Sequence, residues 1–245
     1  MRKIGILGFS QHVRAAPFSD ATWELFGMNG LWRVLTDVPE DRFSMWFEPH
    51  SPAFLEEYGV RANIGTQQQD WLAQQHPFPI FMQEKYPQFP ASEPFPIEAL
   101  IKQHGVDYFT STVAMELAYA LSLKDVEEIG LWGIDLVHGT EWGDQRPCAE
   151  YWIGRAIERG IKVTLPPVCA LLTSQYRYAY ENPNPLMVEL RAGIKLQAET
   201  TAKKIAECHE KVNQLTSELQ TNDGAMQMLR HLTERVDMFE RGGHI

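Results

Sequence analysis

Short apolar runs recur along the first two thirds of the chain, and each ends at a glycine, a proline or a polar cluster. Runs of this length and composition are typical of buried strands. Apolar residues at helical spacing follow in two later stretches, 112–123 and 145–159. Because strands that alternate with helices form parallel sheets with right-handed crossovers, we predict an α/β, Rossmann-like fold with a mostly parallel sheet. The predicted strands are Ile4–Gly8, Trp23–Asn29, Phe43–Glu48, Pro79–Met82, Glu128–Ile134 and Ile161–Leu165.

The segment 59–96 differs from its surroundings because glutamine, proline and aromatic residues dominate it. Proline interrupts regular structure, so we predict irregular chain here around the single short strand Pro79–Met82. A segment of this kind also suits a flap over a binding site.

The last part of the chain changes character after Pro183 and Pro185. Between Leu186 and Gln220 there is no proline, and apolar residues recur at steps of three and four. The turn-forming residues 221–224 interrupt this pattern, which then resumes as far as Phe239. We therefore predict a Rossmann-like domain over 1–182 and a helical hairpin or coiled-coil segment over 183–241. The hairpin either packs on its own domain or joins chains into a homo-oligomer.

Composition narrows the class of protein. Hydrophobic residues make up 44% and charged residues 22% of the 245 residues, values typical of a soluble globular protein. The net charge of -10 argues against wrapping duplex nucleic acid but leaves room for a small anionic ligand in one pocket. The three cysteines form no CxxC pair, which argues against a structural zinc site or a disulfide framework. With no apolar stretch long enough for a signal peptide or a membrane span, we expect a cytoplasmic protein without membrane contact.

Polar residues gather where the predicted strands end, and ligands of open parallel sheets bind beyond the carboxyl ends of the strands. A second group opens the helix at 112, where free N–H groups and the helix dipole favour an anion. A third group follows the strand that ends at Ile134. The first group is Gly8, Ser10, Asn29, His50 and Gln83, the second is Thr110, Ser111 and Thr112, and the third is Asp135, His138, Glu141, Gln145, Arg146 and Tyr151.

Each of these residues has a structural alternative. Gly8 begins neither a GxGxxG motif nor a P-loop, so a tight exit from the strand explains it better than phosphate contact. The helix start at 110–112 is explained equally well by plain capping. Arg146 suits a phosphate, or an ion pair with Glu150 four residues on. A lone histidine is more often structural than a general base, and Tyr151 either stacks on a ring or packs in the core.

The run Phe109–Thr112, followed by a helix and by a strand that ends in Gly133-Ile134-Asp135, resembles the core motif of two families. These are the bacterial sialyltransferases that use a CMP-sugar and the archaeal-type hydroxymethylpterin diphosphokinase-like proteins. The Gly-x-Gly-Pro-Ser that follows their first strand is replaced here by Gly8-Phe9-Ser10-Gln11. The first 175 residues or so also look like uncharacterised tailed-phage proteins, through the runs 23–29, 81–87 and 145–151.

The resemblance to tailed-phage proteins implies a phage-encoded protein, and the polar strand ends with the other two resemblances favour one that binds a nucleotide or nucleotide-sugar and transfers a glycosyl or phosphoryl group. Gly8 and Asn29 would approach the nucleotide, residues 110–112 would receive its phosphates and Arg146 would stabilise the leaving phosphate. Asp135 would hold a ribose hydroxyl or a divalent metal. The identity of any metal stays open, because the loop spacing of Asp135, His138 and Glu141 is not diagnostic. The proton would be moved by Glu141, His50 or His138.

Two other functions remain open from the sequence. One is a non-catalytic phage factor that sequesters a nucleotide signal or binds a host protein, which the absent Gly-Pro-Ser loop favours. The other is a virion or assembly component.

Overall fold

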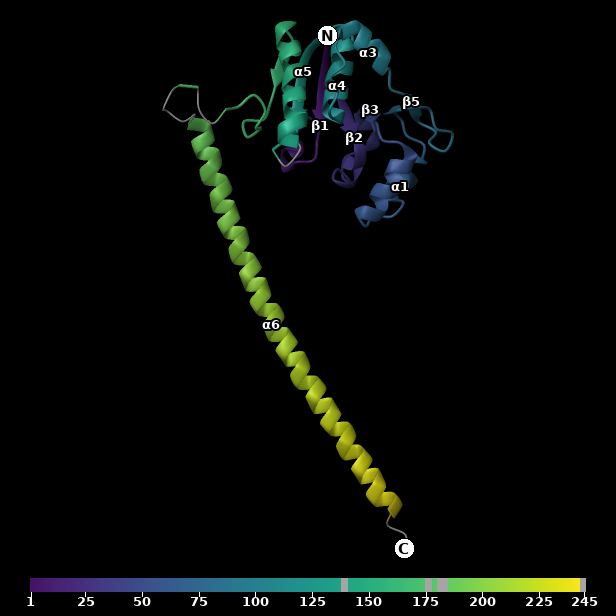
Figure 1. Ribbon diagram of the computed structural model, residues 1–245, viewed down its shortest axis with the longest axis vertical. Coiled ribbons are helices and arrows are strands. Elements are labelled where there is room, and N and C mark those ends of the chain that lie inside the picture. The colour runs from purple at the N-terminus through teal and green to yellow at the C-terminus, as the bar shows by residue number, and fades with distance from the viewer. Residues whose placement is uncertain (138–140, 175–177, 180–184, 243–245) are drawn as a thin grey trace. The chain divides into compact units, whose positions relative to one another are not determined.

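A computed structural model describes residues 1–137, 141–174, 178–179 and 185–242. Contacts within the chain divide it into two compact units, Met1–Thr173 and Ser174–Ile245 (Figure 1). The predicted boundary at 182/183 falls among residues 180–184, outside the described part, and stays a prediction.

Unit 1 is built on one parallel sheet of seven strands, in the order β5-β4-β3-β2-β1-β6-β7. Every neighbouring pair is parallel, and β1 lies between β2 and β6, with Ile4 opposite both Glu24 and Ile129. This confirms the predicted α/β class with its parallel sheet. The strands are β1 (Arg2–Leu7), β2 (Trp23–Met28), β3 (Phe43–Phe47), β4 (Ile80–Met82), β5 (Ser92–Pro94), β6 (Val126–Trp132) and β7 (Lys162–Thr164).

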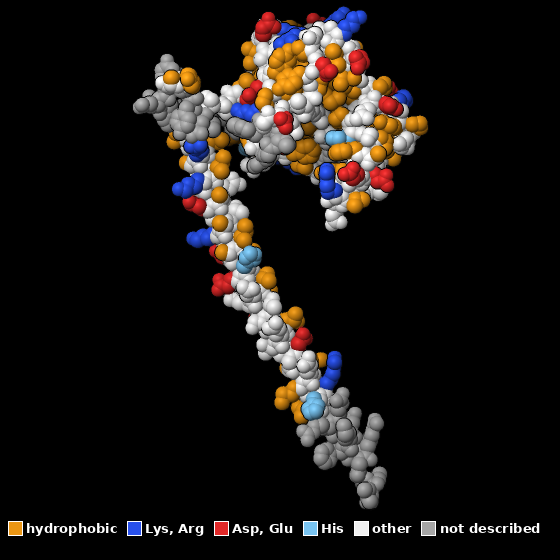
Figure 2. Space-filling view, viewed as in Figure 1, with side chains coloured by type: hydrophobic (Ala, Val, Ile, Leu, Met, Phe, Trp, Pro, Cys, Tyr) orange, Lys and Arg blue, Asp and Glu red, His pale blue; other side chains and the backbone are white. Residues whose placement is uncertain are grey.

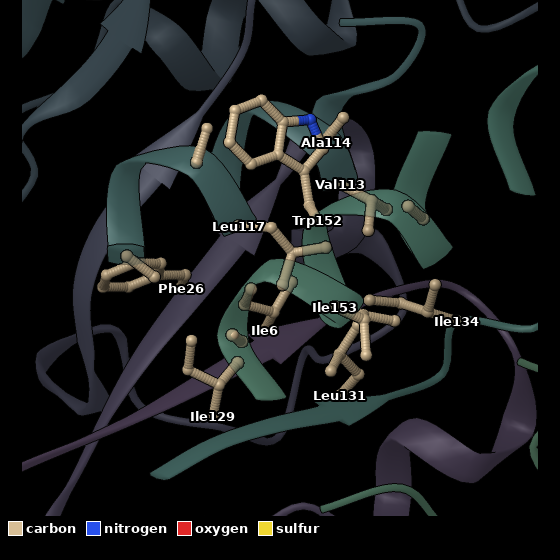
Figure 3. Packing of buried hydrophobic residues seen from close by; sticks show 14 of the residues in the cluster. Ile6, Phe26, Val113, Ala114, Leu117, Ile129, Leu131, Ile134, Trp152 and Ile153 are labelled. Carbon is tan, nitrogen blue, oxygen red and sulfur yellow. The ribbon is translucent and has the colours of Figure 1, made fainter. Parts of the chain in front are cut away.

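Helices cover both faces of the sheet. Side chains alternate between the faces along each strand, so Ile4 and Ile6 point into one core while Leu7 points into the other. The first core packs against α3 (Ile97–His104), α4 (Thr112–Ser122) and α5 (Arg146–Glu158). The second, rich in tryptophan, packs against α1 (Pro52–Arg61) and α2 (Gln67–Leu72). Figure 3 shows the first core, where these labelled residues meet: Ile6, Phe26, Val113, Ala114, Leu117, Ile129, Leu131, Ile134, Trp152 and Ile153.

Local sequence explains where the two central helices begin. Ser111 is the N-cap of α4, and its hydroxyl accepts a hydrogen bond from the backbone N–H of Ala114 at 3.3 Å. One turn of π-helix, Glu141–Gln145, precedes α5, and Pro147 lies in the first turn of that helix as predicted. Both predicted helices are therefore present.

The prediction of irregular chain over 59–96 is wrong in part. This segment contains α2 and two strands, β4 and β5, of which the sequence indicated only β4. Strand β5 was missed because it is three residues long and ends in Pro94, which is tolerated because β5 is an edge strand. Three short 3-10 helices in unit 1 were not predicted either: Gln11–Ala15, Asn29–Arg33 and Glu40–Arg42.

Unit 2 contains one continuous helix, α6 (Pro185–Gly242), of 58 residues. The helical character of the tail is confirmed, but the predicted hairpin is wrong, because residues 221–224 are helical. Asparagine, aspartate and glycine lower helix propensity by at most about 1 kcal/mol each, and no proline is present to break the backbone hydrogen bonds. Among the described helices, none is long and apolar enough to cross a membrane.

Candidate functional site

The strand order reverses at β1, because the chain moves from β1 toward β5 and then returns to the other side of β1 with β6. Ligands bind at this switch point in parallel sheets, beyond the carboxyl ends of the strands. A pocket of about 510 Å³, here named the crest pocket, opens there. Eight of the predicted site residues line it: Gly8, Ser10, Asn29, Ser111, Thr112, Asp135, Glu141 and Gln145.

The floor of the crest pocket is made by two loops that follow β1 and β6. The backbone N–H of Gly8 donates to Trp132 O at 2.8 Å, and that of Ser10 donates to Gly133 O at 2.9 Å. A Cβ on Gly8 would lie 2.4 Å from Gly133 O, and one on Gly133 would lie 2.6 Å from Gly8 O. Gly133 also has a φ of 77°. The glycine at position 8 therefore serves a tight strand exit, the alternative that the sequence favoured.

Three residues that line the crest pocket carry hydrogen-bond donors without a partner in the described part of the chain. The N–H groups of Thr112 and Val113, in the first turn of α4, have no acceptor within the described part of the chain. The hydroxyl of Ser10 is buried and has no hydrogen-bond partner there either. Buried polar groups are almost always satisfied, so an orphaned hydroxyl in a pocket indicates that something else completes it. Together these groups suit an anion.

Backbone strain marks two further lining residues. Asn29 has a φ of 45° and Leu136 a φ of 48°, both in the left-handed region. Asparagine tolerates this conformation, but for leucine it is an outlier that the surrounding structure must hold in place. The side chain of Asn29 lies 3.4 Å from the Thr112 hydroxyl, which links the end of β2 to the start of α4. Strain of this kind clusters at ligand sites.

The crest pocket is also lined by carboxylates. Asp135 and Glu141 both line it, and no lysine or arginine is found among its described lining residues. No cluster of three potential metal ligands occurs among the described residues. The pocket therefore combines uncharged hydrogen-bond donors with carboxylate acceptors.

Five of the predicted site residues that the structure describes lie outside the crest pocket: Thr110, Gln83, Arg146, Tyr151 and, in a second pocket described below, His50. The Thr110 hydroxyl donates to Asp144 O at 2.9 Å, and Gln83 is exposed beyond β4. Arg146 forms the ion pair with Glu150, at 2.9 Å, and also donates to the carbonyls of Ala170 and Thr173. Tyr151 packs edge-on against Tyr108 and Trp152, and its hydroxyl accepts from Arg155.

For Arg146 the structure thus has the alternative that the sequence offered, an ion pair four residues along the helix. His138 lies outside the described residues.

His50 lines a second pocket, of about 240 Å³, which begins at the end of β3 and is here named the β3 pocket. Nδ1 of His50 lies 2.6 Å from Oε1 of Glu48, whose side chain is 1% exposed. The other carboxylate oxygen accepts from Gln68 Nε2 at 2.8 Å. Phe9 and Asn29 line both pockets, so the two are neighbours along the crest.

Sequence reasoning missed the β3 pocket as a site. Glu48 and Gln68 are 20 residues apart, and Arg33 and Arg61 reach the same pocket from other elements. The one available signal was the alternation Glu48-Pro49-His50 directly after a strand, which places a carboxylate and an imidazole within reach of each other.

Comparisons with known proteins give no sequence-level relative: no family model matches the chain, and none of the curated proteins matches it. Nothing in them supports the resemblance to tailed-phage or diphosphokinase-like proteins.

Solved structures with a similar fold include the sialyltransferase CstII. A complex with a trisaccharide acceptor and CMP is 16% identical, with a TM-score of 0.39 over 67% of this chain and 80% of that chain. The Campylobacter jejuni enzyme with CMP-3FNeuAc is 17% identical, with a TM-score of 0.40 over the same shares. With cytidine-5'-monophosphate it covers 80% of this chain and 99% of that chain, at 16% identity and a TM-score of 0.39. A TM-score of 0.4 at this identity is too low to support an argument about ligand or reaction.

Proposed function

We propose that the crest pocket binds a nucleotide-sugar and that the protein transfers its glycosyl group to an acceptor. The observation that carries the proposal is that Thr112, Val113 and Ser10 line one pocket, and that the backbone N–H groups of the first two and the hydroxyl of the third have no hydrogen-bond partner within the described part of the chain. Phosphate is the anion that helix N-termini bind most often in nucleotide sites.

The charge of the lining favours a ligand with little negative charge. Since no cationic side chain is found among the described lining residues, one helix terminus and a few hydroxyls must balance the phosphate. A single phosphodiester fits this better than a diphosphate. Asp135, which lines the same pocket, can accept hydrogen bonds from ribose or sugar hydroxyls, as acidic residues do in dinucleotide-binding folds.

Glycosyl transfer suits this lining better than phosphoryl transfer. Phosphoryl transfer depends on cations that neutralise the transferred group. Glycosyl transfer instead breaks a carbon–oxygen bond and leaves a phosphate, which the first turn of α4 would stabilise.

Calorimetry with a panel of nucleotides and nucleotide-sugars, with and without Mg²⁺, tests this proposal. We expect binding by at least one member, and a loss of affinity of about 10-fold to 100-fold in Ser10→Ala, which removes a hydrogen bond to the anion, or in Asp135→Asn, which replaces a charged acceptor by a neutral one. Gln83→Ala, exposed and outside the pocket, is the matched control. Failure of every panel member to bind would overturn the proposal.

Turnover separates transfer from mere binding. If the bound nucleotide-sugar is recovered unchanged with a wide set of acceptor alcohols, a sequestering protein is the better description. The Glu141→Gln variant provides a second measurement, because a catalytic role predicts a protein that binds normally and turns over slowly.

A further inference from the structure

We propose that the β3 pocket is the acceptor subsite of this transfer, with His50 as the general base and Glu48 as the residue that positions it. The proposal rests on the proposed function of the crest pocket. The subsite would take an alcohol that also carries an anionic group.

A chain of hydrogen bonds fixes the orientation of each group behind His50. The indole Nε1 of Trp32 donates to Gln68 Oε1 at 2.9 Å, and Arg33 donates to the same oxygen at 3.3 Å. An indole N–H can only donate, so the amide of Gln68 must present its oxygen there and its Nε2 toward Glu48.

Both oxygens of Glu48 therefore act as acceptors. Gln68 donates to Oε2, and His50 faces Oε1 through Nδ1. Because a carboxylate oxygen accepts and does not donate, the proton of the imidazole belongs on Nδ1. Glu48 is almost fully buried, which keeps water from competing for these bonds.

The other ring nitrogen of His50 is left to react. Nε2 makes no hydrogen bond within the described part of the chain, and the side chain is 36% exposed to the pocket. Stacking on Phe54, with ring centroids 4.4 Å apart and an interplanar angle of 13°, holds the ring plane. A carboxylate that orients an imidazole through Nδ1 is the arrangement by which enzymes make Nε2 a general base.

The remaining lining indicates the acceptor's chemistry. Arg33 and Arg61 both line the pocket, and the guanidinium of Arg61 lies 5.7 Å from the centroid of the Tyr58 ring. Two guanidinium groups favour a carboxylate or phosphate on the ligand. Since Phe9 and Asn29 are shared with the crest pocket, an alcohol held here lies next to the donor.

The step balances with these groups alone. The acceptor hydroxyl gives its proton to Nε2 of His50, and its oxygen forms a bond to the anomeric carbon of the donor. The bond from that carbon to the phosphate oxygen breaks, and its electron pair leaves with the nucleotide. Glu48 stabilises the imidazolium that forms.

A substrate-independent test uses nitrogen NMR of the full chain labelled in histidine. We expect the Nδ1–H tautomer at His50 in the unmodified protein and a mixture of tautomers in Glu48→Gln, because the amide no longer requires a proton on Nδ1. A wild-type His50 that carries its proton on Nε2 would overturn the assignment. Glu56→Gln, an exposed change on α1, is the matched control.

Glycerol 3-phosphate, an alcohol with an anionic group, is the probe for the subsite itself. We expect it to shift the His50 signals in the unmodified chain and in Lys102→Ala, an exposed cation on α3, but not in Arg61→Ala. No shift at His50 in the unmodified chain would overturn the acceptor subsite. Binding at the crest pocket is measured separately by calorimetry, so the two proposals can fail independently.

Once a donor is found, kinetics give a third readout. His50→Asn should lower kcat by about 10²-fold to 10⁴-fold with little change in donor affinity. Glu48→Gln should also lower kcat and alter its pH profile, which a purely structural residue would not do. An unchanged kcat in both variants would contradict the role of His50 as the general base.

A different observation leads to a second inference, on α6. Its residues at alternating steps of four and three from 194 to 229 are mostly apolar, and the spacing continues without a break through 221–224. This is a heptad seam, in which Asn222 and Thr201 are the polar members. The seam is Ile194, Ala198, Thr201, Ile205, Cys208, Val212, Leu215, Leu219, Asn222, Met226 and Leu229.

The apolar members of the seam are exposed in the single chain. Val212 and Leu215 are each 58% exposed and Leu219 is 61% exposed, and Figure 2 shows hydrophobic side chains along this helix. An isolated helix has little stability without packing. A sustained apolar repeat of 3.5 residues causes two such helices to wind around each other. We infer that a second copy of α6 covers the seam.

The polar seam residues favour a parallel pair in register. In that arrangement Asn222 meets Asn222 of the second copy, and the two amides can satisfy each other. In an antiparallel pair each core layer joins one heptad position to the other, and Asn222 and Thr201 share one position while the other position is apolar throughout, so the amide would face a side chain that cannot form a hydrogen bond.

Sedimentation equilibrium of the full chain tests this inference. We expect a discrete oligomer that Leu215→Glu dissociates and the neighbouring Gln214→Glu, off the seam, does not. Oxidation should join two chains through Cys208, which lies on the seam, and Cys208→Ser should abolish the link. A monomer at all concentrations would overturn the pairing, and an oligomer without the Cys208 link would overturn the parallel register.

Discussion

Glu116 lies on α4 one turn beyond Thr112, with its carboxyl completely buried and with no hydrogen-bond partner among the described residues. Burial raises the pKa of this carboxyl well above 4.5, so the folded protein holds the proton to a higher pH than the unfolded chain does. The unfolded chain loses that proton above about pH 4.5. Glu116 therefore makes the free energy of unfolding fall as the pH rises from there toward the folded pKa.

We expect Glu116→Met to raise the free energy of unfolding at pH 7 by about 1–3 kcal/mol, because it removes an unsatisfied buried group and keeps the volume. Thermal unfolding from pH 4 to pH 8 is the measurement, and the variant should lose part of the pH dependence. Glu98→Met, at an exposed position on α3, is the control. A destabilised Glu116→Met would mean that the carboxyl has a partner.

Cys169 is buried, and its thiol donates at 3.2 Å to the carbonyl oxygen of Ile134, a residue that lines the crest pocket. Burial raises the pKa of this thiol to about 11, so almost no thiolate forms near neutral pH. In a Cys208→Ser background we expect the two remaining thiols, Cys148 and Cys169, to react slowly with a disulfide reagent at pH 8. Both should react at once in denaturant. Fast labelling of the folded protein would contradict the packing.

Among the structural elements, the paired loops after β1 and β6 depend most on glycine. Gly133→Ala forces a side chain into a left-handed backbone and against Gly8 O, so we expect a loss of about 1–3 kcal/mol in unfolding free energy and weaker ligand binding. The control is Gly154→Ala, in the middle of α5 with open space around it. That change should stabilise the fold by about 0.5–1 kcal/mol. Equal effects in urea unfolding would contradict this account.

The elements that could be predicted are those whose burial leaves a mark in the sequence. Six strands and two helices were predicted because their apolar runs are long or regular. Eight residues that line the crest pocket were predicted because the carboxyl ends of parallel strands meet at one edge of the sheet. Strand β5 has only one buried residue, Ser92, and so left no apolar run. The network from Trp32 to His50 joins residues whose proximity comes from tertiary folding alone. The hairpin prediction for the tail was wrong for another reason. Residues 221–224 have a turn-forming composition, but the apolar repeat continues through them and the helix is not interrupted.

At the scale of the whole molecule, the two units carry separate tasks in this interpretation. A chain that ends at Ser174 keeps the Thr173 carbonyl that Arg146 contacts and all lining residues of both pockets. We expect it to fold, to be monomeric and to bind the same nucleotide-sugar as the full chain. Circular dichroism, light scattering and calorimetry check the three points in turn. Loss of binding by a folded fragment would contradict the separation.

The position of β1 also has a consequence for synthesis of the protein. β1 is made long before β6, yet it pairs with it, as in Ile4 opposite Ile129. At roughly 5–20 residues per second, the ribosome takes several seconds to produce the second neighbour of this strand. During that interval one edge of an apolar strand is open, and pairing over such a separation in sequence is slow. We therefore expect the growing chain to depend on chaperones until β6 has emerged. The folding yield should rise when the supply of chaperone keeps pace with translation.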